Sequence, residues 1–491
     1  MSTASTAQAE PVSSIRDLAD FYARGATAPK DQLIGAENEK PPFYIKDNNP
    51  GSYHGDKKHD GLKDVFKTLA DKKGWQPVFE GQNITGLKKD GANWSFEPSL
   101  QTETSGAPFN NVHSIAVETD TTISEAVKVA RGHGIRFVSI AYHPTHAPRE
   151  LPEVPRQRYE VMHAFCDRVG SPQGHGMMAS TSTVQANLNY ASEEDMVLKL
   201  RVSLALQPIV TALYANSPFK DGKPSGFESY RSHNNHNIMG GRYGFMFPEA
   251  FQPGFGYEKL AEYFAREVPM IGLYKGNVFL DANGGSFADF MQGKLAIVPG
   301  QQATTTDFIN HVKTIFPEVR PQPAPGVLEM RGADTGPQEM IKALPALWAG
   351  ILYDPKSLRD AWEMVKDWSD IDREYLRASV PRTGLQTPIH GTTVQDIAKN
   401  MLALSSEGLK RRGVLNAKGQ DERIYLEPLH EIADTGRNWA QRLLDRYDNV
   451  WKGDISRLMV EQDYANSPSV LKPYLPAPTK GRTISAPKPP N

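Results

Sequence analysis

The sequence predicts an α+β fold, with an antiparallel or mixed sheet, helices around it and a helical C-terminal part. Short runs typical of strands alternate irregularly with segments of helical periodicity, and from residue 357 onward the pattern is mostly helical. No internal repeat is present, so a solenoid or propeller is not indicated. The 491 residues exceed what one hydrophobic core usually holds, which predicts two domains or one large domain with helical additions.

The individual elements follow from local periodicity and composition. Strands are predicted at residues 75–80, 94–97 and 135–140, where β-branched and aromatic residues cluster. Apolar residues recur with helical spacing at residues 122–133, 192–215, 358–368, 394–412 and 426–446. The second of these helices carries Glu193, Glu194 and Asp195 near its start, where the helix dipole favours acidic side chains.

The two ends of the chain are predicted to be appendages. Residues 466–491 are rich in Pro, Lys, Ser and Thr and have few bulky apolar side chains, which is typical of an extended tail. Residues 1–27 are predicted to be an N-terminal appendage, which leaves residues 28–465 as the main domain. Residues 1–14 lack a basic start and an apolar stretch, so we expect no secretory signal.

Composition excludes several classes of protein. Hydrophobic residues make up 39% and charged residues 23% of the chain, which excludes global disorder. The formal charge of -2 offers no overall footprint for nucleic acid or an anionic membrane, and the most apolar stretch, residues 204–213, is too short and too interrupted to span a membrane. The single cysteine, Cys166, excludes an intramolecular disulfide and predicts a reducing compartment, with a cytoplasmic location as the default.

Two acidic segments have the spacing of paired ligands on strands. Glu37 and Glu39 are two residues apart, and Gln101 and Glu103 repeat the spacing a few residues after Glu97. On a strand, residues two apart point to the same face. Two such strands side by side would offer a wall of oxygen atoms, which suits Mg²⁺ ions that bridge phosphates. The alternative is that both segments are solvated strand faces.

A third segment, residues 327–334, sets Glu329 and Arg331 two apart within an apolar strand. A lone charge would be expensive to bury there. A carboxylate for a metal ion and a guanidinium group for a phosphoryl group is the functional interpretation, and an ion pair between the two side chains is the alternative. The chain has neither a Walker-A loop nor a G-x-G-x-x-G motif after a strand, so any use of ATP requires another architecture.

The chain resembles the plant and proteobacterial type of glutamate-cysteine ligase, whose fold is related to that of glutamine synthetase. The resemblance runs from about residue 34 to 412 and rests on motifs at residues 181–188, 204–209, 215–219, 222–224 and 328–334. It implies a catalytic domain with a curved, mostly antiparallel sheet, in a monomer or homodimer. It also implies that ATP phosphorylates the γ-carboxylate of glutamate with the help of Mg²⁺, after which an acceptor amine attacks the acyl phosphate.

The resemblance assigns a role to each matching residue. Arg331 would stabilise the transferring phosphoryl group, and together with Glu329 it would be catalytic. Gln101 and Arg331 would arrange ATP. The implied metal ligands are Glu37, Glu39, Glu97, Glu103 and Glu329. The implied substrate-binding residues are Arg158, Ser180, Thr181, Ser182, Thr183, Gln185, Asn187, Arg231, His233, Asn235 and Arg242, with Arg231 holding the carboxylate of glutamate.

Departures from the family pattern concentrate around the expected acceptor. Residues 234–244 lose a tryptophan and three acids of the family motif, and residues 180–183 lose an arginine and a cysteine. Asn38 replaces a histidine, while Ser99 and Leu100 replace two glycines, which predicts that the backbone there no longer adopts a glycine-only conformation or no longer allows a ligand to approach closely. Cysteine is therefore the leading acceptor, another amine or amino acid is the alternative, and a donor other than glutamate or a non-catalytic ATP-binding relative are further possibilities.

Overall fold

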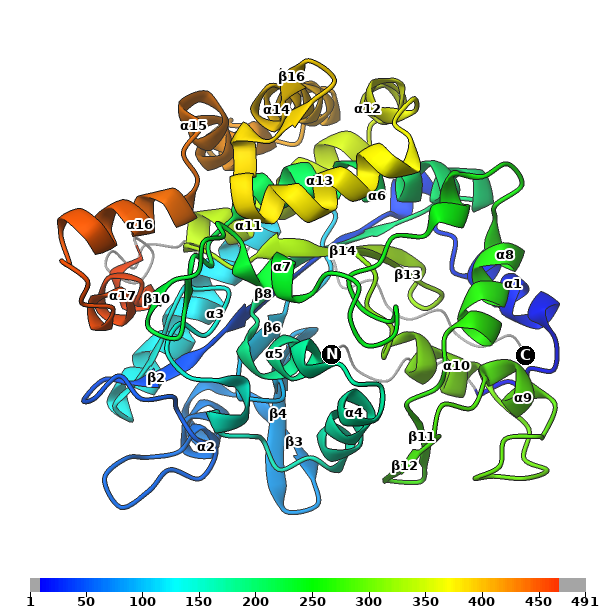
Figure 1. Ribbon diagram of the computed structural model, residues 1–491, viewed down its shortest axis with the longest axis horizontal. Coiled ribbons are helices and arrows are strands. Elements are labelled where there is room, and N and C mark those ends of the chain that lie inside the picture. Colours follow the sequence, from blue (N-terminus) through cyan, green and yellow to red (C-terminus); the bar gives the residue numbers. More distant parts are fainter. Residues whose placement is uncertain (1–8, 468–491) are drawn as a thin grey trace.

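An eight-stranded sheet forms the centre of the computed structural model, which describes residues 9–467 (Figure 1). Its strand order is β13-β14-β8-β1-β6-β5-β4-β3, and every neighbouring pair is antiparallel, which confirms the predicted sheet. In that order the strands are Val319–Gln322, Val327–Asp334, Thr183–Asn189, Ile34–Lys40, Thr102–Ser105, Ala92–Phe96, Asn83–Lys89 and Gln76–Glu80.

Four small two-stranded sheets lie outside this sheet among the described residues. They are β2 with β7, β9 with β10, β11 with β12 and β15 with β16. In chain order these strands are Pro42–Tyr44, Ile135–Phe137, Phe219–Lys220, Lys223–Pro224, Gly272–Lys275, Val278–Asp281, Pro388–Ile389 and Thr392–Thr393.

Helices pack around the sheet in two layers on one side. The helices α6 and α11 contact β14 and β8, α2 contacts β4, and α12 and α14 pack outside α11. The α-helices α1 to α17 are, in chain order, Ile15–Arg24, Leu62–Lys73, Val112–Gly132, Gln157–Arg168, Pro172–Ser180, Glu193–Tyr214, Tyr230–Asn234, Tyr257–Glu262, Phe287–Met291, Thr305–Val312, Gln338–Leu352, Pro355–Val365, Asp370–Thr383, Val394–Arg412, Glu427–Thr435, Trp439–Asn449 and Ser456–Glu461. Figure 1 shows the predicted helical C-terminal part as a layer along one edge of the molecule.

Helix boundaries follow capping signals. The predicted helix at 394–412 is α14, which begins at a capping box formed by Thr393 and Asp396 and ends at Gly413 with a φ of 63°. The predicted helix at 426–446 is instead two helices, α15 and α16. Gly436 ends the first with a φ of 68°, and the side chain of Asn438 caps the second. Periodicity alone did not reveal this break, because the apolar spacing continues across it.

The core begins before residue 28. Helix α1 buries Leu18 and Tyr22, and the Tyr22 hydroxyl donates a hydrogen bond of 3.3 Å to the carbonyl oxygen of Pro321 next to the sheet. The predicted N-terminal appendage therefore contains a packed helix. Of the predicted tail, only Asn466 and Ser467 fall within the described residues.

Helix α6 runs through the middle of the core. Among the described helices it alone is long and apolar enough to cross a membrane by length and composition, yet 89% of its most apolar window is buried inside the protein. The helix continues through Pro208, which the sequence analysis treated as an interruption of the apolar stretch. A helix that is apolar on all sides is expected where neighbours cover it completely.

Candidate active site

Antiparallel pairing brings the predicted acidic residues onto one face of the sheet. Glu39 on β1 lies directly opposite Glu103 on β6, and Glu37 lies opposite Gln185 on β8. Like charges directly opposite one another destabilise an antiparallel pair. A sheet that places two carboxylates in this relationship is typical of a functional site, where local rules of stability are broken.

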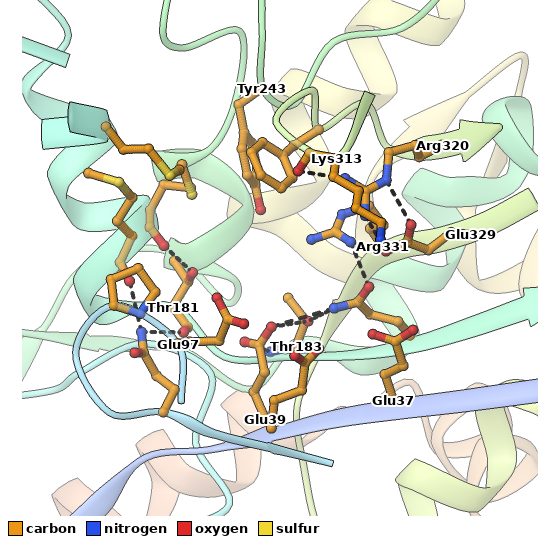
Figure 2. Close-up of a pocket in the computed structure, with 18 of the residues that line it drawn as sticks. Glu37, Glu39, Glu97, Thr181, Thr183, Tyr243, Lys313, Arg320, Glu329 and Arg331 are labelled. Atoms are coloured by element: carbon orange, nitrogen blue, oxygen red, sulfur yellow. Dashed lines mark hydrogen bonds and ion pairs between the residues drawn. The ribbon is translucent and has the colours of Figure 1, made fainter. Parts of the chain in front are cut away.

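These residues face a pocket that leaves about 830 Å³ free of protein atoms, part of it open to solvent. Figure 2 shows Glu37, Glu39 and Glu97 on one side of this central pocket and Lys313, Arg320 and Arg331 on another. Ten predicted site residues line it: Glu37, Glu39, Glu97, Gln101, Glu103, Thr181, Thr183, Gln185, Glu329 and Arg331. The lining residues that the sequence analysis missed are Pro98, Tyr159, Met162, Met177, Met178, Tyr243, Lys313, Phe316, Arg320 and Gln322.

Strand β8 holds the acids of β1 by hydrogen bonds. The backbone N–H of Thr183 donates to Oε2 of Glu39 over 2.9 Å, and the Thr183 hydroxyl donates to Oε1 over 3.1 Å. The side-chain amide of Asn187 donates to Oε1 of Glu37 over 2.8 Å. Thr183 and Asn187, both predicted as substrate-binding residues, therefore orient the two carboxylates.

Ionisation of the carboxyl groups on the acidic side of the pocket is unfavourable. Burial, together with the nearby carboxylate of Glu103, raises the pKa of Glu37 and of Glu39 to about 8 and the pKa of Glu97 to about 7. A cation that replaces the bound protons would relieve this repulsion. The donors are all oxygen atoms, which fits Mg²⁺, although within residues 9–467 no three His, Cys, Asp or Glu side chains are already arranged around one metal position.

Glu329 holds the opposite, cationic side of the pocket together. Arg320 on β13 donates Nε to Oε2 of Glu329 over 2.7 Å and Nη2 to Oε1 over 3.0 Å, and Arg331 pairs with Oε1 of the same carboxylate. Nη1 of Arg331 also donates to Oε1 of Gln185 over 2.7 Å. Burial opposes ionisation of Glu329, but the two arginines outweigh it and hold its pKa below the ordinary value. The ion pair between Glu329 and Arg331 is thus present, within a larger network.

Two predicted residues serve the pocket mainly from its edge. Gln101 lines it, but its amide donates to the carbonyl oxygens of Met178 and Thr181, both over 3.0 Å. Its side chain therefore ties the β5–β6 connection to α5 and β8. Arg158 on α4 is buried and does not line the pocket, although its charge acts to lower the pKa of Glu97 against the larger effect of burial.

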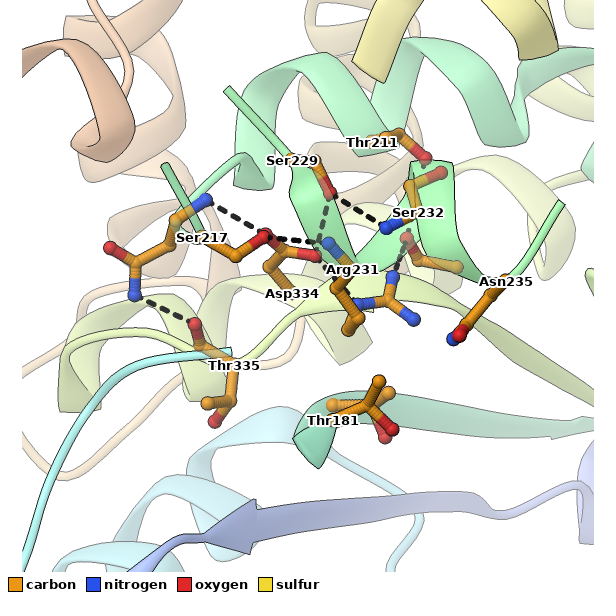
Figure 3. Close-up of polar contacts among 12 residues, drawn as sticks. Thr181, Thr211, Ser217, Ser229, Arg231, Ser232, Asn235, Asp334 and Thr335 are labelled. Carbon is orange, nitrogen blue, oxygen red and sulfur yellow. Dashed lines mark hydrogen bonds and ion pairs between the residues drawn. The ribbon is translucent and has the colours of Figure 1, made fainter. Parts of the chain in front are cut away.

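Arg231 does not line the central pocket and lies in a buried cluster centred on Asp334 (Figure 3). Nε of Arg231 donates to Oδ1 of Asp334 over 2.6 Å, and Nη2 donates to the carbonyl oxygen of Gly332 over 2.5 Å. The hydroxyls of Ser217 and Ser229 also donate to Asp334. Asp334 ends the motif at 328–334, yet the sequence analysis gave it no role, because nothing local shows that two distant segments, residues 216–217 and 229–231, converge on it.

The remaining predicted residues do not line the central pocket. Arg242 is buried and its Nη1 donates to Oγ1 and the carbonyl oxygen of Thr314, so its contact with substrate stays a prediction. Ser180, Ser182 and Asn235 are buried, and Figure 3 shows Asn235 near Arg231. His233 stacks on Phe227 and borders a second, more open depression, whose lining includes Tyr230, Asn234, Asn237, Ile238, Met239, Gly240 and Glu374.

The glycine replacements change the backbone less than predicted. Leu100 has a φ of 71°, so the left-handed conformation persists without glycine, which corrects the sequence-based expectation. Holding a leucine there costs about 1–2 kcal/mol. The side chain of Leu100 is fully buried, and burial of a leucine contributes about 1.5–3 kcal/mol, enough to offset that cost.

Comparisons with known proteins agree with this geometry. Chloroplastic glutamate-cysteine ligase B of Oryza sativa subsp. japonica is 40% identical over 448 residues, covering 91% of this chain and 87% of that protein. The chloroplastic glutamate-cysteine ligase of Arabidopsis thaliana is 38% identical over 448 residues, covering 91% and 82%. The model of glutamate-cysteine ligase family 2 matches residues 33–461. The chain belongs to glutamate-cysteine ligase family 2.

Membership of glutamate-cysteine ligase family 2 confirms the resemblance found in the motifs and makes the chain an ATP-dependent ligase. The crystal structure of a glutamate-cysteine ligase from Francisella tularensis in complex with AMP superposes with a TM-score of 0.50 at 12% identity, covering 88% of this chain and 89% of that one. At that identity the likeness establishes the fold, and it confirms the predicted glutamine synthetase-like architecture.

The predicted cytoplasmic location is contradicted by these comparisons, because both plant relatives of glutamate-cysteine ligase family 2 are named as chloroplastic proteins. The prediction rested on the single cysteine, which indicates a reducing compartment. That argument does not distinguish the cytosol from other reducing compartments.

Proposed function

We propose that the protein joins the γ-carboxylate of glutamate to the amine of cysteine at the expense of ATP, the first step of glutathione synthesis. The γ-carboxylate attacks the terminal phosphorus of ATP, which gives ADP and γ-glutamyl phosphate. The amine then attacks the acyl carbon, forming the amide and releasing inorganic phosphate and a proton. The observation that carries this proposal is the central pocket, in which carboxylates on one side face arginines on the other.

The acidic side fits a role in metal binding. Glu37, Glu39, Glu97 and Glu103 would hold Mg²⁺, which would neutralise phosphate charge during transfer. Because the carboxylates do not yet surround one point, ion binding is expected to draw them together.

The cationic side fits stabilisation of the transferred group. Arg331 lies on β14 between the carboxylates of β1 and the ring of Phe316, and the carboxylates of Glu329, Glu39 and Glu37 hold its pKa above the ordinary value against the opposing effect of burial. A permanently charged, planar donor suits the equatorial oxygens of a phosphoryl group. Glu329 would act chiefly by holding Arg331 and Arg320 in place.

The acceptor is the less constrained part of the proposal. In the segment that departs most from the family motif, residues 234–244, the part before residue 241 borders the second depression, while Tyr243 lines the central pocket. This observation favours an alternative in which another amine or amino acid replaces cysteine, because one changed polar contact can alter substrate preference by orders of magnitude.

Turnover with a panel of acceptors tests both versions. The purified protein is incubated with ATP, Mg²⁺, glutamate and either cysteine or another amine, and ADP and γ-glutamyl products are measured. Cysteine-dependent ADP formation supports the proposal, and ADP formation with a different amine alone supports the alternative. If Mg-ATP binds but no acceptor gives turnover, the protein is a non-catalytic relative. If ADP forms equally well without glutamate, the donor assignment is wrong.

A further inference from the structure

Three cations line the central pocket, and one of them lacks a partner. Arg320 and Arg331 both pair with Glu329. Nζ of Lys313, which lines the same pocket, has no hydrogen-bond or ion-pair partner among the described residues. The cationic side therefore carries more positive charge than its own carboxylate neutralises.

Lys313 follows α10 on a turn that two arginines hold from opposite sides. Nη1 of Arg320 donates to the carbonyl oxygens of Lys313 and Ile315, each over 3.2 Å. Nη1 of Arg242 donates to the carbonyl oxygen of Thr314 over 2.9 Å and to its hydroxyl over 3.0 Å. Four hydrogen bonds from cationic donors thus fix a turn of three residues.

The same turn is joined to the segment that contains Arg242. The N–H of Phe316 donates to the carbonyl oxygen of Arg242 over 2.9 Å, and the N–H of Gly244 donates to the carbonyl oxygen of Phe316 over 2.8 Å. Between them, the ring of Tyr243 lies 5.1 Å from that of Phe316, and both rings line the pocket.

Arg242 is an expensive residue to place in this position. Only 1% of it is exposed, its Nε and Nη2 have no partner among the described residues, and burial lowers its pKa to about 9. A buried cation without a carboxylate partner costs free energy that the rest of the fold must offset. The described polar contacts of the Arg242 side chain are with Thr314, which indicates that Arg242 stabilises the turn at residues 313–315.

We propose that Lys313 binds the phosphates of the nucleotide and that Arg242 and Arg320 are positioning residues for it. The proposal rests on the ligase function proposed above and adds residues to its nucleotide side. A triphosphate carries several charges and requires several cations, whereas a single carboxylate of glutamate requires one. Lys313 lies beside Arg320 and Arg331, so the three cations together would neutralise the negative charges of the triphosphate.

Steady-state kinetics of Lys313→Met and Lys313→Arg test the contact. Lys313→Met is expected to raise KM for ATP by at least about tenfold while KM for glutamate changes by less than about threefold. Lys313→Arg, which keeps the charge, should stay within about threefold of the parent in both. Lys294→Met is the matched control, since Lys294 is exposed and lies away from the pocket. A larger effect on glutamate than on ATP, or no effect on either, overturns the assignment.

The positioning role has its own readout. Thr314→Val removes the hydroxyl group that accepts a hydrogen bond from Arg242. Arg242→Met removes both hydrogen bonds between Arg242 and Thr314. Each should raise KM for ATP selectively, and the double variant Lys313→Met/Thr314→Val should be about as impaired as Lys313→Met alone, because both changes act through one contact. If the fold-changes in KM for ATP of the two single variants instead multiply in the double variant, while its thermal midpoint is unchanged, the positioning role is contradicted.

Calorimetric binding of ADP separates this proposal from the ligase function. The measurement requires no turnover and no acceptor. If the parent binds ADP and Lys313→Met binds it at least about tenfold more weakly, the phosphate contact holds even if no acceptor amine is found. If the two bind ADP equally, the contact is refuted while the ligase function stands.

Discussion

Glu39 and Glu103 oppose one another across the β1–β6 pair, the arrangement that an antiparallel sheet tolerates least for two like charges. The backbone of Thr183 and the hydroxyl of the same residue bind one of them, yet the pKa of Glu39 remains raised to about 8. Burial and the neighbouring Glu103 together disfavour ionisation of Glu39, and a bound cation would offset both effects.

Substitution of Glu39 by Gln should separate stability from activity. At pH 9 without divalent ions, loss of the repulsion is expected to raise the free energy of unfolding by about 0.5–1 kcal/mol. The rate of ADP formation should fall about a hundredfold, because a ligand charge is lost. Urea unfolding and turnover check the two effects, with Glu267→Gln on the exposed surface as control. Unchanged Mg²⁺ dependence in Glu39→Gln would refute the metal assignment.

The raised pKa values of Glu37 and Glu39 predict an unusual pH dependence. Each group keeps its proton in the folded state up to about pH 8 but loses it in the unfolded state near pH 4.5. The folded protein therefore binds more protons in this window, so these two groups make stability fall as pH rises from about 4.5 to about 8.

Mg²⁺ should reverse that loss. We expect the urea midpoint at pH 9 to rise on addition of Mg²⁺ by more than the midpoint at pH 6, with protons released on binding. The difference should disappear in Glu37→Gln/Glu39→Gln. Equal stabilisation by Mg²⁺ at both pH values would show that the ion binds elsewhere.

Replacement of Glu329 by Gln should be damaging in two ways. The buried arginines Arg320 and Arg331 lose their shared countercharge, which should cost about 3–5 kcal/mol of stability. Turnover should fall by on the order of a hundredfold or more, since Arg331 is no longer held. Thermal unfolding and kcat test the prediction, and Arg331→Lys should be almost as harmful to kcat. A stable Glu329→Gln protein with near-normal kcat would contradict it.

Asp334→Asn should destabilise the buried cluster that Asp334 forms with Arg231. The variant leaves Arg231 buried without its countercharge, so we expect a loss of about 3–5 kcal/mol in the free energy of unfolding. Asp360→Asn, which also breaks an ion pair but on the exposed surface of α12, should cost far less. Equal losses in the two variants, measured by urea unfolding, would argue against a special role for Asp334.

The acidic side of the site was predictable from sequence because its information is local. Residues two apart on a strand share a face, so Glu37 with Glu39 and Glu329 with Arg331 were found from spacing and motif. Arg320 and Lys313 were missed, since each lies in a short segment whose direction is decided by tertiary packing. For the same reason the sequence did not reveal the contact of Arg242 with Thr314, because a match to a motif position does not determine which way a side chain points.

The irregularity in β14 has a consequence for motion. Between the pairs Met330–Ala186 and Ala333–Val184, β14 advances by three residues while β8 advances by two, so the alternation of its side chains shifts by one place. Asp334 thereby lies opposite Thr183, on the face that also carries Glu329. Strand β14 therefore carries both Arg331 and Asp334, the partner of Arg231, and joins the two parts of the site through three residues of one paired strand. We expect any closure over substrates to move the helices α4 and α5, which contribute Tyr159, Met162, Met177 and Met178 to the pocket, against this sheet.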